Sequence, residues 1–317
     1  MLQEIASRCK TPREMSQELR PHWDGYLLFD EKMCSIRGYQ QWYYMAVDRT
    51  GDIIHCRQVR ELTSTEAIAF LDEVKALPVT CRGIVTDMDQ ALTKAVGVVF
   101  PGKPHQYCLK HVLDSIDQRI GYTKIIHDRR SRTTALRREF ERLPDRRWMW
   151  KQRSRDEFMR HWKTTRPMTE QYKEIKALRD YAYRILFAKT ELLAEEQFEE
   201  LRRAQGLPKK RQQKVVTFFQ QHWDHLVAHH LTPGLPRTTN LIENVNKQLE
   251  RRFKTIESFQ YKWTAGSYMN LLIAYLRQKP YTDCRRSRRH LNGHSRLFAA
   301  GVRNLSKDWL KNCLKNA

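Results

Sequence analysis

Three acidic residues lie where predicted strands end or a predicted helix begins. Asp30 and Asp87 each follow an apolar run, at 26–29 and 83–86, and Glu243 lies on the first turn of a predicted helix. Phosphodiester cleavage by two divalent ions needs about three converging carboxylates, because hard Mg²⁺ prefers oxygen ligands and the paired ions flank the phosphate. These residues are therefore candidates for a metal-dependent site that acts on a phosphodiester.

Each acid also has an ordinary structural interpretation. An acid after a strand is usually a turn residue or a helix cap, and Asp87 or Asp89 could cap a helix that begins at Gln90. The run Asn240–Glu243 fits a capping box, in which the glutamate only reaches back to a backbone N–H. Residue types alone leave both interpretations open. We interpret Glu31 and Asp89 as bystanders.

The elements that would position these acids follow a recognisable order. Residues 26–29, 41–47 and 53–59 are rich in β-branched and aromatic residues and are separated by turn signals, which predicts a three-stranded antiparallel meander. Helical spacing then begins at Ser64 or Thr65 and continues to Val74. A strand at 83–86, a helix at 91–100 and a fifth strand at 105–108 follow.

This order resembles that of an RNase H-like domain, and it predicts an α/β fold with a mixed five-stranded sheet. Strands one and four are neighbours in such a sheet, so Asp30 and Asp87 should emerge at one edge.

From about 112 to 221 only helical spacing remains. A helix then opens near Thr239 or Asn240, after a Pro-Gly break, and a second is predicted over 256–276. We predict five segments: 1–24, a remnant of an N-terminal region; 25–111, the first part of the core; 112–236, a helical insertion; 237–278, the final helices of the core; and 279–317, a basic tail that is irregular at first.

Two blocks resemble the DDE transposases of the RNase H-like superfamily, specifically Mutator-like enzymes and related bacterial insertion-sequence transposases. The run 87–111 contains the aspartate, an Ala-Leu helix, a Phe-Pro-Gly turn and a C-x-x-H pair, and 238–252 is similar to the block around the catalytic glutamate. The resemblance implies that Asp30, Asp87 and Glu243 are the catalytic residues and metal ligands. It assigns structural or supporting roles to Cys108 and His111.

The same resemblance implies the activity and its requirements. The chain would cleave and transfer DNA strands of an insertion element with two Mg²⁺ ions, or Mn²⁺ in their place, and the helical segment would be an insertion before the last catalytic helix. Its partners would be double-stranded DNA, as element ends and target, and further copies of the chain on that DNA. The location would be the bacterial nucleoid in the cytoplasm for an insertion sequence, or the nucleus for a eukaryotic element. The resemblance covers about 25–276, and only 24 residues precede it where related enzymes carry a DNA-end-binding module.

Charge is concentrated in the second part of the chain. The formal net charge is +22, and residues 1–110 contain 14 basic and 14 acidic residues, so residues 111–317 carry the whole excess. A polyanionic partner is indicated. One group of candidate DNA-binding residues is Lys247 and Arg251, on the same helical face as Glu243, with Arg252 beside them. The other group is the cluster Arg146, Arg147, Trp148 and Trp150. The two tryptophans could instead pack in the core of the helical segment.

Other interpretations remain. The chain could be a non-catalytic DNA-binding derivative of a transposase, or an RNase H-like nuclease without strand transfer, which the long helical insertion disfavours. A zinc site at His105, Cys108 and His111 is disfavoured, because a strand followed by a helix scatters these side chains and the spacing is short.

The seven widely separated cysteines favour a reducing compartment, and no signal peptide, membrane span or membrane partner is expected.

Overall fold

The chain folds as two units, one a mixed α/β unit and the other helical. The structure is a computed structural model that describes residues 2–315 except 129–130, 132–169 and 257. The first unit comprises Met1–Cys108 and Leu231–Ala317, and the second comprises Leu109–His230. The chain thus leaves the first unit after the fifth strand and returns to it later, and the first unit contains all three candidate acids.

A meander of three antiparallel strands begins the sheet: β1 (Tyr26–Ile36), β2 (Tyr39–Asp48) and β3 (Ile53–Val59). Arg37 and Gly38 both have positive φ, at 50° and 79°, which gives the mirror-image two-residue turn that suits the twist of a hairpin. Strand β1 is longer than the predicted 26–29, because β2 pairs with it as far as Ile36. Asp30 therefore lies within β1 rather than at its end.

Two short parallel strands complete the sheet. β4 (Gly83–Thr86) pairs with β1, β5 (His105–Tyr107) pairs with β4, and the order is β3-β2-β1-β4-β5. The predicted neighbourhood of strands one and four is confirmed. β4 pairs with only the first three residues of β1, at Tyr26–Leu28, so Asp30 lies just beyond the point where this parallel pairing ends.

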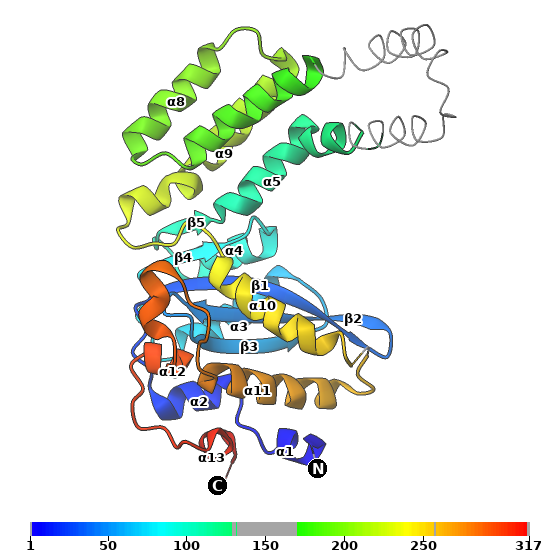
Figure 1. The fold of residues 1–317 in the computed structure, drawn as a ribbon, viewed down its shortest axis with the longest axis vertical. Helices are drawn as coiled ribbons and strands as arrows, with labels where there is room; N and C mark the ends of the chain where they lie inside the picture. The colour runs from blue at the N-terminus through cyan, green and yellow to red at the C-terminus, as the bar shows by residue number, and fades with distance from the viewer. Residues whose placement is uncertain (1, 129–130, 132–169, 257, 316–317) are drawn as a thin grey trace, which may run out of the picture. The chain divides into compact units, whose positions relative to one another are not determined.

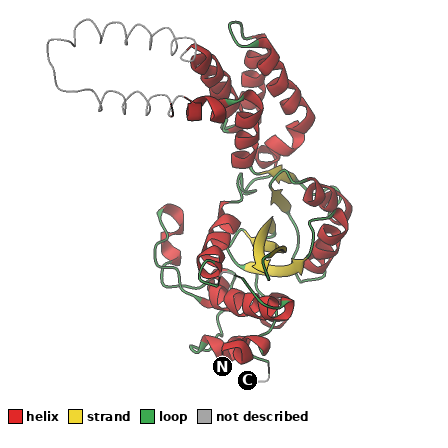
Figure 2. Ribbon diagram, turned by 90° about the vertical axis from the view of Figure 1, so that its right-hand side faces the viewer, coloured by secondary structure: helices red, strands yellow, loops and turns green. Residues whose placement is uncertain are grey.

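Helices cover both faces of the sheet (Figure 2). α3 (Ser64–Lys75) and α4 (Gln90–Val99) bury the face that carries Phe29 in a core with Phe70 and Leu92. α2 (Pro12–Leu19), α10 (Asn240–Phe253) and α11 (Lys262–Gln278) contact strands of the meander (Figure 1). Successive side chains of a strand point to opposite faces, so β1 directs Phe29 towards α3 and α4, and Asp30 towards α10.

The start of α11 differs from the prediction. The helical pattern predicted a start at Ile256, whereas the helix begins at Lys262. The reason is that Phe259 extends the hairpin: its N–H donates to the carbonyl of Ser35 at 3.0 Å, and its carbonyl accepts from the N–H of Arg37 at 2.7 Å. These tertiary hydrogen bonds replace a first helical turn.

The two ends of the chain pack together on α11. α1 (Leu2–Ser7) and α13 (Trp309–Cys313) contribute to one small core with α11 and α12 (Arg296–Ala299). The segment predicted as a basic tail also contains the 3₁₀ helix η1 (Arg286–Leu291). Residues 279–315 are therefore a folded part of the first unit.

A buried ion pair connects these terminal elements to the meander. Arg277 of α11 donates two hydrogen bonds to Asp52, at 2.8 and 2.9 Å, and both side chains are fully buried. The same guanidinium donates to the carbonyl of Pro12 and to Ser16 Oγ, and Trp23 Nε1 donates to Asp52. One network thus joins α2, the β2–β3 turn and α11.

In the second unit all described secondary structure is helical, as the sequence predicts for this part of the chain. It contains α5 (Leu109–Ile120), α8 (Glu191–Arg203), α9 (Lys209–Leu231) and helical residues 122–128 and 170–186. Arg179 donates to both carboxylate oxygens of Asp117 at 2.8 and 2.9 Å. Of the helices in the described parts of the chain, none has the length and apolar character needed to cross a membrane.

Candidate functional site

The sheet brings two of the three predicted acids together. Asp30 of β1 and Asp87, directly after β4, each have a carboxylate oxygen within 4.8 Å of the other and of a carboxylate oxygen of Glu31. The parallel pairing of β1 with β4 produces this arrangement, because its last pair is Leu28 with Val85 and each aspartate follows its paired residue by two positions. All three side chains are partly exposed.

Glu31, which the sequence led us to interpret as a bystander, also lies in this cluster. Strand alternation places it on the face opposite Asp30, yet its carboxylate reaches the same edge, and its Oε2 is buried without a hydrogen-bond partner among the described residues. Burial and the negative charges of Asp87, Asp30 and Asp89 raise the pKa of Glu31 to about 8. The edge of the sheet therefore disfavours further negative charge unless a cation is present.

The alternative role of Asp87 as a helix cap is not what the structure shows. Asp89 is the N-cap of α4, and its Oδ1 accepts from the N–H of Leu92 at 2.8 Å. Asp87 Oδ1 accepts from the N–H of Asp89 at 2.9 Å, an Asx-type turn that directs the chain from β4 into α4. This turn holds the Asp87 carboxylate at the strand end and leaves the capping of α4 to Asp89.

Helix α10 carries Glu243 and is attached directly to β1. Asn246 Nδ2 donates to Asp30 Oδ2 at 2.8 Å, and Lys32 forms a 3.4 Å ion pair with Glu250 further along both elements. Glu243 precedes Asn246 by three residues, so the two side chains lie on the same face of α10, with Cβ atoms about 5–6 Å apart. The hydrogen bond to Asp30 thus places Glu243 one helical turn from the carboxylate cluster.

Glu243 does not form the capping box that the sequence allowed. The N-cap of α10 is Thr239, and its side chain accepts no capping hydrogen bond. Thr239 Oγ1 instead lies 3.5 Å from Glu243 Oε1 and 3.3 Å from Cys108 Sγ. The Cys108 N–H donates to the carbonyl of Thr86, the residue before Asp87, at 2.7 Å. Thr239, Cys108 and Thr86 thus form a series of contacts that connects Glu243 with the residue before Asp87.

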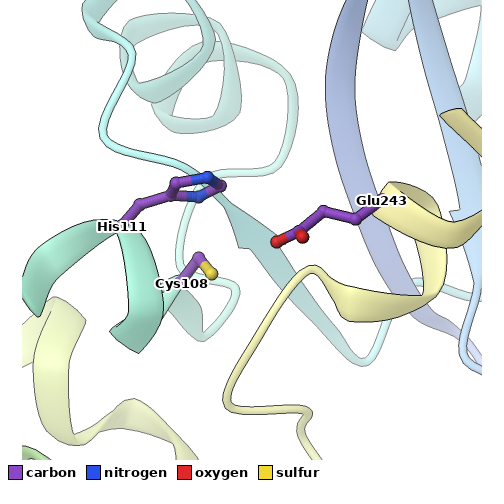
Figure 3. Close-up of side chains that lie close together, drawn as sticks. All are labelled: Cys108, His111 and Glu243. Carbon is purple, nitrogen blue, oxygen red and sulfur yellow. The ribbon is translucent and has the colours of Figure 1, made fainter. Parts of the chain in front are cut away.

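Figure 3 shows Cys108 and Glu243 together with His111, which follows Cys108 by three residues on the first turn of α5. Cys108 is fully buried, as expected of a structural residue. His105 is part of β5 and its Nε2 lies 2.9 Å from Thr86 Oγ1, within the sheet. His105 of this H-x-x-C-x-x-H run is therefore part of the sheet.

The candidate DNA-binding residues of α10 are exposed. Lys247, Arg251 and Arg252 all have exposed side chains, and Lys247 Nζ lies 4.0 Å from Glu243 Oε2. Lys247 and Arg251 follow Glu243 by one and two helical turns, so they form a basic row leading away from the acids. Arg146, Arg147, Trp148 and Trp150 lie outside the described residues.

The arrangement is suited chemically to hard divalent cations. Its potential ligands on β1 and after β4 are carboxylate oxygens, which Mg²⁺ and Mn²⁺ prefer. A cation would also relieve the repulsion among these carboxylates, which adds to the effect of burial on the pKa of Glu31. Asn246 was not singled out from the sequence. Its spacing of three residues from Glu243 is the signal that could have indicated it.

Comparison with known proteins adds no family assignment. No protein-family model matches the chain, and no curated protein matches it.

Proposed function

We propose that this chain is the catalytic part of a DDE-type transposase on an RNase H-like fold, an enzyme that cleaves and joins DNA strands with two divalent metal ions. The observation that carries the proposal is the meeting of Asp30 and Asp87 at adjacent segments of the sheet, with α10 hydrogen-bonded to Asp30 one turn from Glu243. The sheet order and the blocks at 87–111 and 238–252 support the same proposal.

Each residue then has a defined task. Asp30, Asp87 and Glu243 would hold two Mg²⁺ ions, which when bound supply activation of water and stabilisation of the charge that develops on the phosphate. Asn246 orients Asp30 through its 2.8 Å hydrogen bond, and Thr239 contacts the carboxylate of Glu243.

The chemistry proceeds in two displacements at phosphorus. Water attacks the scissile phosphate, the bond to the bridging 3′ oxygen breaks, and that oxygen leaves as a free 3′ hydroxyl. The 3′ hydroxyl then attacks a phosphodiester of target DNA, forming one new bond and releasing one 3′ hydroxyl of the target. Lys247 and Arg251 would hold the DNA backbone beside the acids.

The deciding experiment uses DNA that carries the ends of the element encoding this chain, incubated with the protein and Mg²⁺. Joined products that disappear in Asp30→Asn, Asp87→Asn and Glu243→Gln variants would support the proposal. Nicks without joining would indicate a hydrolytic nuclease of the same fold. DNA binding without either product, with the DNA ends and the ion both supplied, would indicate a non-catalytic derivative.

A further inference from the structure

A basic pocket lies beside α10, next to the row of Lys247 and Arg251. It has a volume of about 570 Å³, and its walls are α10 on one side and the segment 279–296 on the other, with Gly51 of the β2–β3 turn. Its lining contains one acidic side chain, Asp283, and six basic ones: Lys247, Arg251, Lys279, Arg285, Arg288 and Arg296. Such an excess of cations around a cavity favours an anionic ligand.

The wall opposite α10 is a defined structure rather than a loose tail. The backbone N–H of Tyr281 donates to the carbonyl of His294 at 2.9 Å, and the N–H of Gly293 donates back to the carbonyl of Tyr281 at 2.8 Å. Asn292 bonds both the N–H and the carbonyl of Cys284, at 2.7 and 3.1 Å. The backbone of the loop is therefore held in place by its own hydrogen bonds.

Arg296 gives the pocket a feature that surface cations lack. It is only 4% exposed, and its Nε is buried without a hydrogen-bond partner in the described parts of the chain. Its contacts there are the carbonyl of Leu276, at 2.8 Å from one terminal nitrogen, and the ring of Tyr281, 5.0 Å from its central carbon. A buried charge without an opposite charge is costly, so an anion in the pocket would offset this cost.

We propose that this pocket binds a backbone phosphate of the DNA strand that leads to the acidic site, with Arg296 as its buried cation and Arg285 as an exposed one. The choice of DNA as ligand rests on the proposed function. A phosphodiester presents paired oxygens that match the fork of a guanidinium, and the pocket contains several such groups.

The position of the pocket on α10 agrees with this ligand. Arg251 follows Glu243 by eight residues, which is about 12 Å along the helix axis. That distance corresponds to the rise of roughly three to four base pairs, at about 3.4 Å each, along a duplex whose axis runs parallel to α10. A strand whose scissile phosphate lies at Glu243 can therefore place a later phosphate in the pocket, with Lys247 between them.

The first test measures DNA binding without catalysis. A labelled duplex is titrated with protein in EDTA over a salt series, comparing wild type with Arg285→Glu and with the matched control Arg289→Glu. Arg289 is exposed and belongs to η1 but does not line the pocket. Arg285→Glu should weaken binding at least several-fold and reduce the salt slope by about 1, with a smaller effect in the control. Equal losses in both variants would overturn the pocket as a specific site.

The second test examines the buried cation with inorganic phosphate as the probe. Phosphate should raise the melting temperature of the wild type above that in chloride at the same ionic strength, and Arg296→Met should lose this increase. If Arg296→Met does not fold, Arg285→Glu in the same comparison should show a reduced increase, and Arg289→Glu a normal one. An equal increase in every folded variant would contradict the proposal.

These measurements separate the two proposals. An inactive chain that still binds DNA through Arg285 would overturn the proposed function and support the pocket. An active chain whose Arg285→Glu variant binds DNA as the wild type does would uphold the function and overturn the pocket.

Discussion

At the scale of single residues, the main physical problem of this site is repulsion among carboxylates. Asp30, Glu31 and Asp87 gather at one edge of the sheet, where burial, together with the neighbouring negative charges, raises the pKa of Glu31 to about 8. A folded chain accepts such an arrangement at a cost in stability, and functional sites are where such costs are common. Two measurements follow from the individual residues.

The first concerns Glu31 and pH. In EDTA, folding stability should fall as the pH rises from about 5 to 8, because the folded chain holds a proton on Glu31 that an unfolded glutamate, with an ordinary pKa of 4.5, has lost. Melting temperatures across this range should fall less steeply in Glu31→Gln. Asp48, whose burial raises its pKa to about 7, contributes to the same window, so the difference between variants is the readout.

The matched control for this measurement is Glu61→Gln, a change at an exposed glutamate, which should keep the wild-type slope. Saturating Mg²⁺ should also flatten the wild-type curve, since a bound cation favours the ionised carboxylate. An identical slope in Glu31→Gln and wild type, both in EDTA, would show that Glu31 does not titrate in this window.

The second residue-scale measurement concerns Asn246. Asn246→Ala removes the hydrogen bond to Asp30 and should raise the Mg²⁺ concentration needed for half-maximal cleavage by about 10–100-fold, as loss of a supporting partner does at other metal sites. Asn240→Ala makes the same change at an exposed position of the same helix and should behave as the wild type. A reduced rate with an unchanged Mg²⁺ requirement would mean that Asn246 supports the fold but not the site.

At the scale of elements, the site depends on how α10 is attached to the meander. The sequence predicts the strands, their order and the helix that begins at Asn240, because apolar spacing and turn residues are local signals. It did not predict the full length of β1, the extended residues around Phe259, or the approach of Glu31 to Asp30 and Asp87. These depend on pairing between distant segments, such as β1 with β2 and Phe259 with Ser35, which no local pattern records.

The terminal elements are joined to the same unit by a buried ion pair that can be tested separately. Arg277→Met leaves Asp52 as a buried, uncompensated charge and should lower the free energy of unfolding by about 3–5 kcal/mol. Lys254→Met removes the exposed partner of Glu250 and should leave stability almost unchanged. Urea unfolding curves provide the comparison, and equal midpoints for the two variants would contradict the role assigned to this network.

At the scale of the whole molecule, the net charge is distributed unevenly along the chain. Residues 1–110 are balanced and residues 111–317 carry +22, so DNA contacts should come mainly from the second part. Affinity for duplex DNA should fall steeply between low and physiological salt, in proportion to the phosphates contacted. Binding assays over a salt series measure this slope, and a flat response would assign the basic residues another purpose.

The central claim is that Asp30, Asp87 and Glu243 act together on a phosphodiester through divalent ions. Its most direct test is the rate of Mg²⁺-dependent cleavage by Asp87→Asn, compared with wild type and with Asp72→Asn, the same change at an exposed residue of α3. We predict a loss of about a thousandfold or more in Asp87→Asn, with DNA binding in EDTA unchanged or slightly tighter because one negative charge is removed, and no loss in the control. Full cleavage activity in Asp87→Asn would contradict the mechanism, whatever the fold of the chain.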